Sequence, residues 1–397
     1  MYSKRILIRE NDKIINALWQ DGRIVQLDIE DIDTSNRLLG NIYIGKVKNI
    51  VSNIRAAFIE IGNGQMGYFS LDQNRDPIYT KKGNSKILCA GDEVLVQVSK
   101  EPLKSKDPVL TSEITLSGKY AVLIHGSTGV SVSGKIKDLE FKNQIKEAVL
   151  PFVSDQFAII IRTNAYSAGV EQVLFEIEML KKQYEEILQK ALHRSCFSKV
   201  YEPPAGYLSA IRDTYDDALT EIITDDAILY QNLKDFLEQY DPSNLQKIRF
   251  YEDKLLSLTK LYGIHSCIEN ALKAKVWLKS GGYLVIQPTE ALVVIDVNSG
   301  KAIEGKESAE DTFLKINLEA IQEIVYQLRL RNLSGIIIID FIDMKRPENK
   351  ERLLSEVKRF VKLDPVKTVF VEMTKLNLVE LTRKKIKKPL HEIWKKM

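Results

Sequence analysis

The sequence predicts an α/β protein of several domains that contains a small all-β barrel. Three observations predict this fold class: the length of 397 residues, a series of strand-like runs over residues 40–117, and alternating strand and helix patterns over residues 265–397. Domains usually hold about 100–200 residues, so this length indicates roughly two to four of them. Apolar residues make up 44% and charged residues 28% of the chain, which excludes a mostly disordered or fibrous protein.

The N-terminal region is predicted to form a hairpin followed by a barrel. Within residues 4–30, short apolar runs flank Asp21-Gly22, a pair that is typical of a tight turn between two strands. Further strand-like runs cover residues 42–47, 56–61, 66–71, 93–98 and 109–116. Their spacing, with Gly and Asn in the connections, is typical of a small barrel of about five strands. Residues 62–67 match G-x-G-x-x-G, but a strand follows them, and this context excludes a dinucleotide-binding turn.

The remaining chain alternates helices and strands. Residues 119–165 are predicted to contain both strands and helices, with a strand over 156–162. Apolar residues every three or four positions predict a helix over residues 170–196. A Pro-Pro pair ends this helix, and residues 207–262 alternate strand and helix patterns. In the last block we expect strands at 282–287, 291–297, 335–340 and 366–372, and helices at 308–330 and 347–362.

Two apolar strands of the last block end in carboxylates, Asp296 and Asp340. An Asp that closes a buried strand is costly unless it is paired, capped or bound to a metal. On neighbouring strands the two carboxylates could hold one Mg²⁺, which prefers one or two carboxylates together with water and phosphate oxygens. Asn298 would be a further ligand or a hydrogen-bond donor. The alternative is that Asp296 and Asp340 cap turns or helices, and Asp343 could support the site or cap a helix.

Charge is unevenly distributed along the chain. The total of 57 Lys and Arg against 54 Asp and Glu gives a net charge of +3, but the last fifteen residues, 383–397, hold seven basic residues and one Glu. The tail therefore carries +6 and the other 382 residues carry −3. The basic tail is either a solvated helix end or a contact for RNA, and the sequence leaves both open.

Cysteine and histidine usage excludes several classes of protein. The three cysteines are far apart and form no disulfide framework, which is typical of a reduced, cytoplasmic protein. No Cys-x-x-Cys pair and no histidine ligand spacing occurs, so we expect no structural zinc. No apolar run approaches the roughly 20 residues that span a bilayer, and no signal peptide is apparent, so we expect a protein without a membrane segment.

Five segments together resemble one family. They are Asp296-Val-Asn-Ser-Gly, Asn317-Leu-Glu-Ala-Ile, Gln327-Leu-Arg-Leu-Arg-Asn-Leu, Ile339-Asp-Phe-Ile-Asp-Met and Leu376-Asn-Leu-Val-Glu-Leu-Thr-Arg. Their order and content closely resemble the ribonuclease E/G family, and the resemblance extends from the hairpin turn to about Arg383. It implies an Mg²⁺-dependent endoribonuclease, with Mn²⁺ as a candidate substitute, that hydrolyses single-stranded RNA and leaves 5′-phosphate ends in RNA maturation or turnover. By this resemblance Asp296 and Asp340 are the metal ligands, and Asn298 is the catalytic residue that supports the attacked phosphate.

The resemblance also implies two RNA-binding surfaces. The barrel resembles an S1 domain, in which Phe58 and Tyr68 match stacking aromatics and Lys106 matches a basic RNA contact. The residues alone leave open that Phe58 and Tyr68 belong to the barrel core.

A pocket for a 5′-monophosphate is implied at Gly118, Arg162 and Thr163, with Lys367 at a position where the family often has Arg. An Arg fork and a hydroxyl suit a terminal phosphate. The alternative for Arg162 is an ordinary surface ion pair.

The implied organisation has four parts. Residues 1–35 and 208–278 would form an RNase H-like α/β subdomain into which an S1 domain of the OB-fold type, residues 36–118, is inserted. The sensor region and its helix would cover 119–207, and a DNase I-like catalytic domain with the basic tail would cover 279–397. Many members continue into a Cys-Pro-x-Cys pair that shares zinc between subunits. This chain has no such pair, so a homodimer, if formed, is expected without a zinc bridge.

Two other functions compete with a nuclease. A non-catalytic RNA-binding protein that keeps the fold is the main alternative, although the presence of both Asp residues disfavours it. A nucleotide-binding metabolic enzyme is disfavoured because the chain has neither a Walker sequence nor a glycine fingerprint in a valid context.

Overall fold

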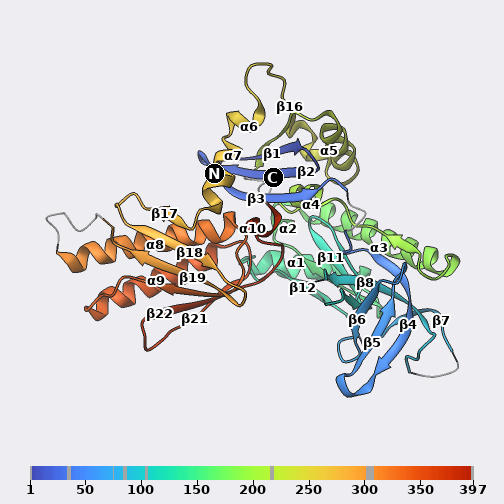
Figure 1. The fold of residues 1–397 in the computed structure, drawn as a ribbon. Helices are drawn as coiled ribbons and strands as arrows, with labels where there is room; N and C mark the ends of the chain where they lie inside the picture. The colour runs from blue at the N-terminus through green and yellow to red at the C-terminus, as the bar shows by residue number, and fades with distance from the viewer. Residues whose placement is uncertain are drawn as a thin grey trace. The chain divides into compact units, whose positions relative to one another are not determined.

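The chain folds into two compact units in the computed structural model, which describes residues 2–33, 37–74, 76–83, 87–102, 106–214, 219–300 and 308–394 (Figure 1). Unit 1 comprises Met1–Ile32 and Asp217–Met397, and unit 2 comprises Asp33–Asp216. Unit 1 is thus discontinuous in sequence. Its N-terminal strand is hydrogen-bonded in parallel to a strand more than two hundred residues later, with Ile6 opposite Ile223.

A closed barrel forms the first part of unit 2. Its strands are β4 (Ile42–Val51), β5 (Ala56–Glu60), β6 (Met66–Ser70), β8 (Glu93–Lys100) and β9 (Val109–Thr111). They pair in the order β4-β5-β6-β9-β8, and pairing of β4 with β8 closes the ring of five, which confirms the predicted barrel. β7 (Ile78–Lys81) and β14 (Lys199–Tyr201) extend this sheet. This strand order fits an OB-type barrel.

The last predicted barrel run, residues 109–116, is wrong as a single strand. β9 ends at Thr111, and residues Thr115–Ser117 form β10 in a separate sheet. The physical reason is that the Asn74 side chain takes the place of a strand partner here. Its Oδ1 accepts hydrogen bonds from Thr111 Oγ1 at 2.7 Å and from the backbone N–H of Ser112 at 2.8 Å. The chain turns at this point and enters the next sheet.

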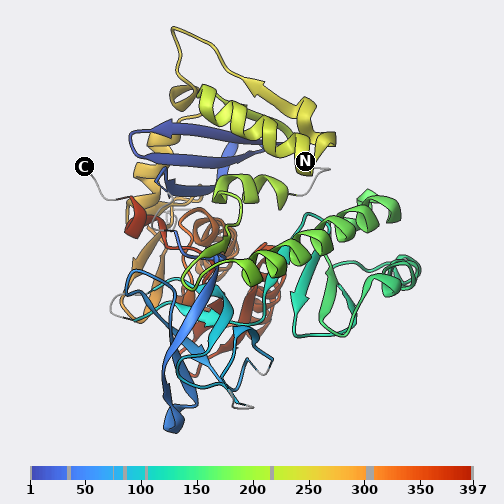
Figure 2. The same ribbon diagram turned by 90° about the vertical axis from the view of Figure 1, so that its right-hand side faces the viewer.

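A small sheet and a long helix complete unit 2. The strands are β10, β11 (Ala121–His125), β13 (Phe157–Ile161) and β12 (Val130–Val132), and the helices include α1 (Leu139–Val149), α2 (Ala165–Ala168), α3 (Val170–His193) and α4 (Gly206–Arg212). The predicted long helix is confirmed as α3, whose buried side chains recur at helical spacing and pack on the sheet (Figure 2). Its aromatic residue Tyr184 stacks on His125, with ring centres 5.8 Å apart.

The first sheet of unit 1 confirms the predicted hairpin. Its order is β16 (Ile248–Phe250), β15 (Leu219–Thr224), β1 (Ser3–Glu10), β2 (Lys13–Gln20) and β3 (Arg23–Asp31). Asp21 and Gly22 join β2 to β3 with φ values of 45° and 92°, as a primed hairpin turn requires. The helices of this part are α5 (Ala227–Tyr240), α6 (Leu258–Leu261), α7 (Ile264–Leu272) and α10 (Leu390–Ile393).

The second sheet of unit 1 has six strands and one covered face. Its order is β17 (Lys275–Trp277), β18 (Tyr283–Pro288), β19 (Leu292–Asn298), β20 (Gly335–Asp340), β22 (Leu378–Arg383) and β21 (Thr368–Met373). Helices α8 (Ala309–Leu330) and α9 (Pro347–Leu363) share one core with alternate residues of every central strand, including Ile295 and Ile337 (Figure 1). Side chains of the opposite face, such as Ile336 at 50% exposure, are open to solvent. We call this second surface the open face.

Candidate active site and RNA-binding surfaces

Asp296 and Asp340 lie side by side on the open face. β19 and β20 run parallel, and the two residues are direct register partners. Asp296 alternates with the buried residues Ile295 and Val297, so its side chain lies on the face away from α8 and α9. Because neighbouring strands are about 4.8 Å apart, the two carboxylates fall within reach of one cation.

Asn298 completes this polar group. Its Nδ2 donates a hydrogen bond to Asp296 Oδ2 at 2.7 Å, so the amide orients one carboxylate. Partial burial, followed by the negative charges of Asp296 and Asp343, raises the pKa of Asp340 above its usual value. A divalent cation between the carboxylates would relieve this repulsion, so the donor set fits Mg²⁺. In the described ranges no group of three or more His, Cys, Asp or Glu side chains is suited to hold a metal.

Neither aspartate caps a helix. The N-caps of the two helices that follow these strands are Ser308 for α8 and Arg346 for α9. Asp343 is not a helix cap either: its Oδ1 accepts a hydrogen bond from Asn377 Nδ2 at 3.0 Å, in the turn between β21 and β22. Capping of these two helices by the aspartates is therefore wrong, because other residues hold the N-cap positions.

Asn317 positions the segment that carries Asp340 and Asp343. This α8 side chain is 0% exposed, its Nδ2 donates to the carbonyl oxygen of Ile342 at 2.8 Å, and its Oδ1 accepts from the Ile342 N–H at 3.1 Å. The sequence alone assigns no role to Asn317. One feature of the sequence could have indicated its burial: Asn317 lies on the helix face that is otherwise apolar.

The barrel presents Phe58 and Tyr68 on its outer surface. The two residues are register partners on β5 and β6, and their rings meet edge to face with centres 6.2 Å apart. Their strand neighbours Ile59 and Phe69 fill the barrel interior instead. The core alternative is therefore wrong, because strand alternation sends these aromatics outward. Lys106 is exposed and lies shortly before β9, which pairs with β6 at Tyr68.

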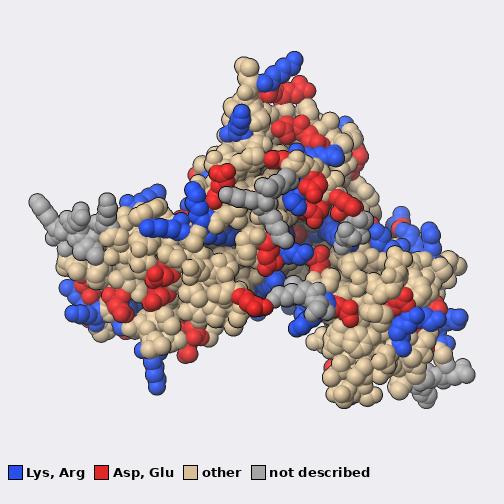
Figure 3. Space-filling view, viewed as in Figure 1, with Lys and Arg blue, Asp and Glu red and all other residues tan. Residues whose placement is uncertain are grey.

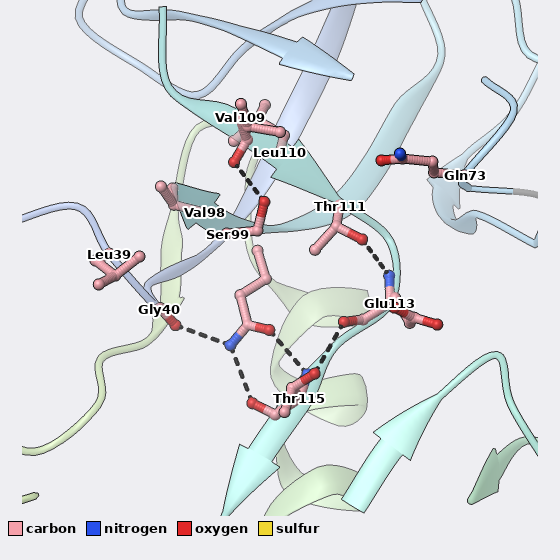
Figure 4. Close-up of a pocket in the computed structure, with 11 residues that line it drawn as sticks. Leu39, Gly40, Gln73, Val98, Ser99, Val109, Leu110, Thr111, Glu113 and Thr115 are labelled. Atoms are coloured by element: carbon pink, nitrogen blue, oxygen red, sulfur yellow. Dashed lines mark hydrogen bonds between the residues drawn. The ribbon is translucent and has the colours of Figure 1, made fainter. Parts of the chain in front are cut away.

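A hollow of about 650 Å³ lies at one end of the barrel, between β8, β9 and the start of β10 (Figure 4). The Gln97 side chain bridges its walls: Nε2 donates to the carbonyl oxygens of Gly40 and Thr115, both at 3.1 Å, and Oε1 accepts from the Thr115 N–H at 2.8 Å. These bonds join the barrel to the small sheet. Neither Phe58 nor Tyr68 lines this hollow, and we assign it a structural role.

Gly118 follows β10, and Arg162 and Thr163 follow β13, in the small sheet. Arg162 Nη1 donates to the Gly118 carbonyl oxygen at 2.5 Å and to Asp213 Oδ1 at 2.7 Å. Thr163 Oγ1 lies 3.0 Å from Ser133 Oγ. The ion-pair alternative for Arg162 thus holds in this structure, although the pair is only partly buried.

Two residues that the sequence did not reveal complete this cluster. Arg212 donates from Nε to the same Asp213 oxygen at 3.2 Å and from Nη1 to the Ser117 carbonyl oxygen at 2.5 Å. Burial opposes ionisation of Asp213, but the two guanidinium groups outweigh it and lower the pKa of this carboxyl. Two cations therefore share one anion.

Gly118 is a glycine because a carboxylate occupies the space of a side chain. A Cβ at this position would collide with the carboxyl group of Glu176, which belongs to α3. That carboxylate accepts hydrogen bonds from the N–H groups of Lys119, Tyr120 and Ala121 at 2.5, 2.7 and 2.9 Å. Burial raises the pKa of Glu176 in spite of these bonds.

Lys367 belongs to unit 1, whereas the other three predicted sensor residues belong to unit 2. It lies between Asp364 and β21, in a connection held by a fully buried ion pair. Arg383 Nε donates to Asp364 Oδ2 at 2.7 Å, and both side chains are 1% exposed. Arg383, the first residue of the basic tail, is therefore a core residue. Lys387 also has a structural partner, because its Nζ lies 2.8 Å from Asp28 Oδ1.

The family follows from comparison of the whole chain. The profile of the ribonuclease E/G family matches residues 115–386. The chain belongs to this family. Ribonuclease G of Haemophilus influenzae is 33% identical over 95% of this chain and 78% of its own length, and ribonuclease G of Escherichia coli is 32% identical over 98% and 81%. Ribonuclease E of Synechocystis is 34% identical over 98% of this chain, which spans 58% of that relative.

Membership of the ribonuclease E/G family makes the chain an endoribonuclease by class. The matched region, residues 115–386, includes the carboxylate pair, the Arg162 cluster and the buried ion pair of Arg383. In the part of the chain that the structure describes, no helix is long and apolar enough to span a bilayer.

Proposed function

We propose that this chain is an Mg²⁺-dependent endoribonuclease that cleaves single-stranded RNA and leaves 5′-phosphate ends. The observation that carries the proposal is the register pairing of Asp296 with Asp340 on the open face. RNA maturation or turnover in the cytoplasm is the corresponding biological role. We further infer that the five-stranded and six-stranded sheets of unit 1 are the RNase H-like and DNase I-like parts of the family fold, and that residues 36–118 are the S1 domain.

Asp296 and Asp340 would hold the ion, and Mn²⁺ could replace Mg²⁺ because it accepts the same oxygen ligands. A bound Mg²⁺ supplies a polarised phosphodiester and a water of lowered pKa. Asn298 keeps Asp296 in one orientation through its 2.7 Å hydrogen bond, and it would support the attacked phosphate, as the family resemblance implies. Cleavage of the bond between phosphorus and the 3′-oxygen leaves the phosphate on the 5′ end of the downstream product.

Single-stranded RNA would bind the barrel through Phe58, Tyr68 and Lys106. Outward aromatic rings stack on bases of any sequence, and a nearby lysine attracts the phosphate backbone. The edge-to-face contact of the two rings fixes their positions before RNA arrives. Unpaired bases are required for such stacking, which accounts for a preference for single strands.

A 5′-monophosphate would bind at Gly118, Arg162 and Thr163, which all belong to unit 2. Asp213 occupies one guanidinium nitrogen of Arg162 in this structure, and a phosphate would compete with it. We infer that this competition makes the pocket respond to a strong terminal anion and ignore a 5′-hydroxyl.

The decisive experiment uses a 5′-labelled single-stranded RNA with Mg²⁺, with and without EDTA. We expect Asp296→Asn and Asp340→Asn to abolish cleavage and to leave RNA binding within about twofold of the parent protein. Both residues lie outside the barrel surface of Phe58 and Tyr68. Glu372→Gln, an exposed residue of β21 in the same sheet, is the matched control and should cleave normally. Full activity in both Asp variants would refute the site.

The same assay tests the non-catalytic alternative and the sensor. A protein that binds RNA but never cleaves it with Mg²⁺ or Mn²⁺ would support the RNA-binding alternative. We also expect faster cleavage of a 5′-monophosphate substrate than of its 5′-hydroxyl counterpart, and loss of this difference in Arg162→Ala. Equal rates on both substrates would argue against the phosphate pocket.

A further inference from the structure

An exposed aromatic group lies at the β17 edge of the six-stranded sheet. Trp277 is 61% exposed, and its ring meets that of Tyr283 at a centre distance of 5.3 Å and an angle of 61°. Lys275 Nζ lies 4.1 Å from the Trp277 ring centre and 3.7 Å from the Tyr283 ring centre. One ammonium group therefore contacts two electron-rich rings.

These side chains lie on the open face and not in the core. Between Lys275 and Trp277, the intervening Val276 packs on the core of α8 and α9. Tyr283 is the register partner of Trp277 on β18, so both rings are on the same surface of the sheet. An exposed tryptophan on a strand gains little stability from its position, which favours a binding role.

The register connects this group to the carboxylate pair. Tyr283 is opposite Asn298, and Lys275 is opposite Val285, which is opposite Asp296. Trp277 is therefore two strands from Asn298, about 10 Å at the usual strand spacing. The turn after Asn298 approaches the start of β18 closely. Gly300 has a φ of 55°, and a Cβ at this position would collide with the Gly281 carbonyl oxygen.

Positive charge accompanies the aromatic rings. Lys273, Lys275 and Lys279 are all exposed around β17. Figure 3 shows Lys and Arg side chains gathered over the part of unit 1 where Figure 1 labels β17. Rings that can stack on bases next to lysines that attract phosphates are the combination used to bind single-stranded nucleic acid.

We propose that Lys275, Trp277 and Tyr283 form a platform that binds an unpaired nucleotide of the RNA next to the bond cleaved at Asp296 and Asp340. The base stacks on Trp277, Tyr283 supports that ring from the side, and Lys275 pairs with the adjoining phosphate. This inference rests on the proposed function for its position beside the cleaved bond. It adds a contact within unit 1 that is separate from Phe58 and Tyr68.

Tryptophan fluorescence tests the contact without any need for cleavage. In Asp340→Asn protein that also carries Trp19→Phe and Trp394→Phe, the remaining tryptophan is Trp277. Titration with a short single-stranded RNA should quench and shift its emission. The matched protein, Asp340→Asn with Trp277→Phe and the other two tryptophans intact, should show no such change. An unchanged spectrum of Trp277 at saturating RNA would overturn the proposal.

Affinity and kinetics provide the second test. We expect Trp277→Ala to weaken RNA binding and to lower kcat/KM by about 5- to 10-fold, at the lower end of the range for loss of one stacked base, and Trp277→Phe to restore most of this loss. Leu255→Ala, an exposed apolar residue elsewhere in unit 1, is the control and should behave as the parent.

The outcomes separate this inference from the proposed function. Quenching of Trp277, together with no cleavage by the parent protein with both aspartates intact in Mg²⁺ or Mn²⁺, would support RNA binding at the platform and refute the proposed function. Normal cleavage by Trp277→Ala with unchanged affinity would refute the platform alone. A change in sedimentation of Trp277→Ala without a change in RNA affinity would show that the rings bind a second copy of the chain, and would also overturn the proposal.

Discussion

Replacement of Asn317 by alanine gives the sharpest test of how the fold holds the proposed active site. The change removes both hydrogen bonds to Ile342, at 2.8 and 3.1 Å, from a side chain that is 0% exposed. A hydrogen bond contributes about 1 kcal/mol net, and a buried group left unpaired adds a cost of about 1–3 kcal/mol. Since Ile342 is only half-buried and water can reach part of it, we expect local destabilisation of about 2–4 kcal/mol.

Hydrogen exchange measured by mass spectrometry is the appropriate assay. A chain with more than one unit does not unfold in a single two-state step, whereas exchange reports the local opening free energy of each segment. Peptides that cover residues 335–344 should exchange about 30-fold faster or more in Asn317→Ala, since each 1.4 kcal/mol is a factor of ten. Cleavage should fall in parallel, because Asp340 and Asp343 flank the freed residue.

The control is Asn270→Ala, which changes an exposed side chain at the end of α7 in the same unit. Its exchange over residues 335–344 should match the parent protein. The reasoning is refuted if Asn317→Ala leaves that segment as protected as before, or if the control loosens it equally.

Three further predictions concern charged and titrating groups. Asp213→Asn removes the anion that competes for Arg162, so stimulation by a 5′-monophosphate RNA should occur at a lower RNA concentration. If stimulation instead needs a higher RNA concentration, the carboxylate positions the arginine. Asp364→Asn leaves Arg383 as an unpaired buried charge and should destabilise unit 1 by about 3–5 kcal/mol, seen as a lower Tm of its unfolding transition. Burial lowers the pKa of His125 below its usual 6.5, so the folded protein binds fewer protons than the unfolded chain and stability should fall as the pH drops below about 6.5. His125→Phe should lose this part of the acid dependence, and identical pH profiles of the two proteins would contradict the assignment.

Some elements were predictable because their signal is local. The helix α3 was predictable from apolar spacing along one face, and β19 and β20 from short apolar runs that end in a carboxylate. β17 and β22 were not predicted as strands. β17 has three residues, and β22 mixes apolar and charged residues, so each depends on its pairing partner for its conformation.

The direction of the barrel aromatics needed the closed structure. The sequence showed Phe58 beside Ile59 and Tyr68 beside Phe69, and either member of each pair could have filled the interior. Closure of the ring through β4 and β8 directs Ile59 and Phe69 inward, so Phe58 and Tyr68 lie on the outer surface of the barrel.

The sequence by itself determined the family resemblance, the barrel, the long helix and the two strands whose ends carry Asp296 and Asp340. These depend on the period of apolar residues and on short ordered motifs, which neighbouring residues establish. The tertiary structure alone decided which distant groups meet: Asn317 with Ile342, Arg162 and Arg212 with Asp213, and Trp277 with Tyr283 on the surface of Asp296. The physical reason is that strand register and helix packing set these contacts, and both arise from burial of the whole core rather than from any local segment.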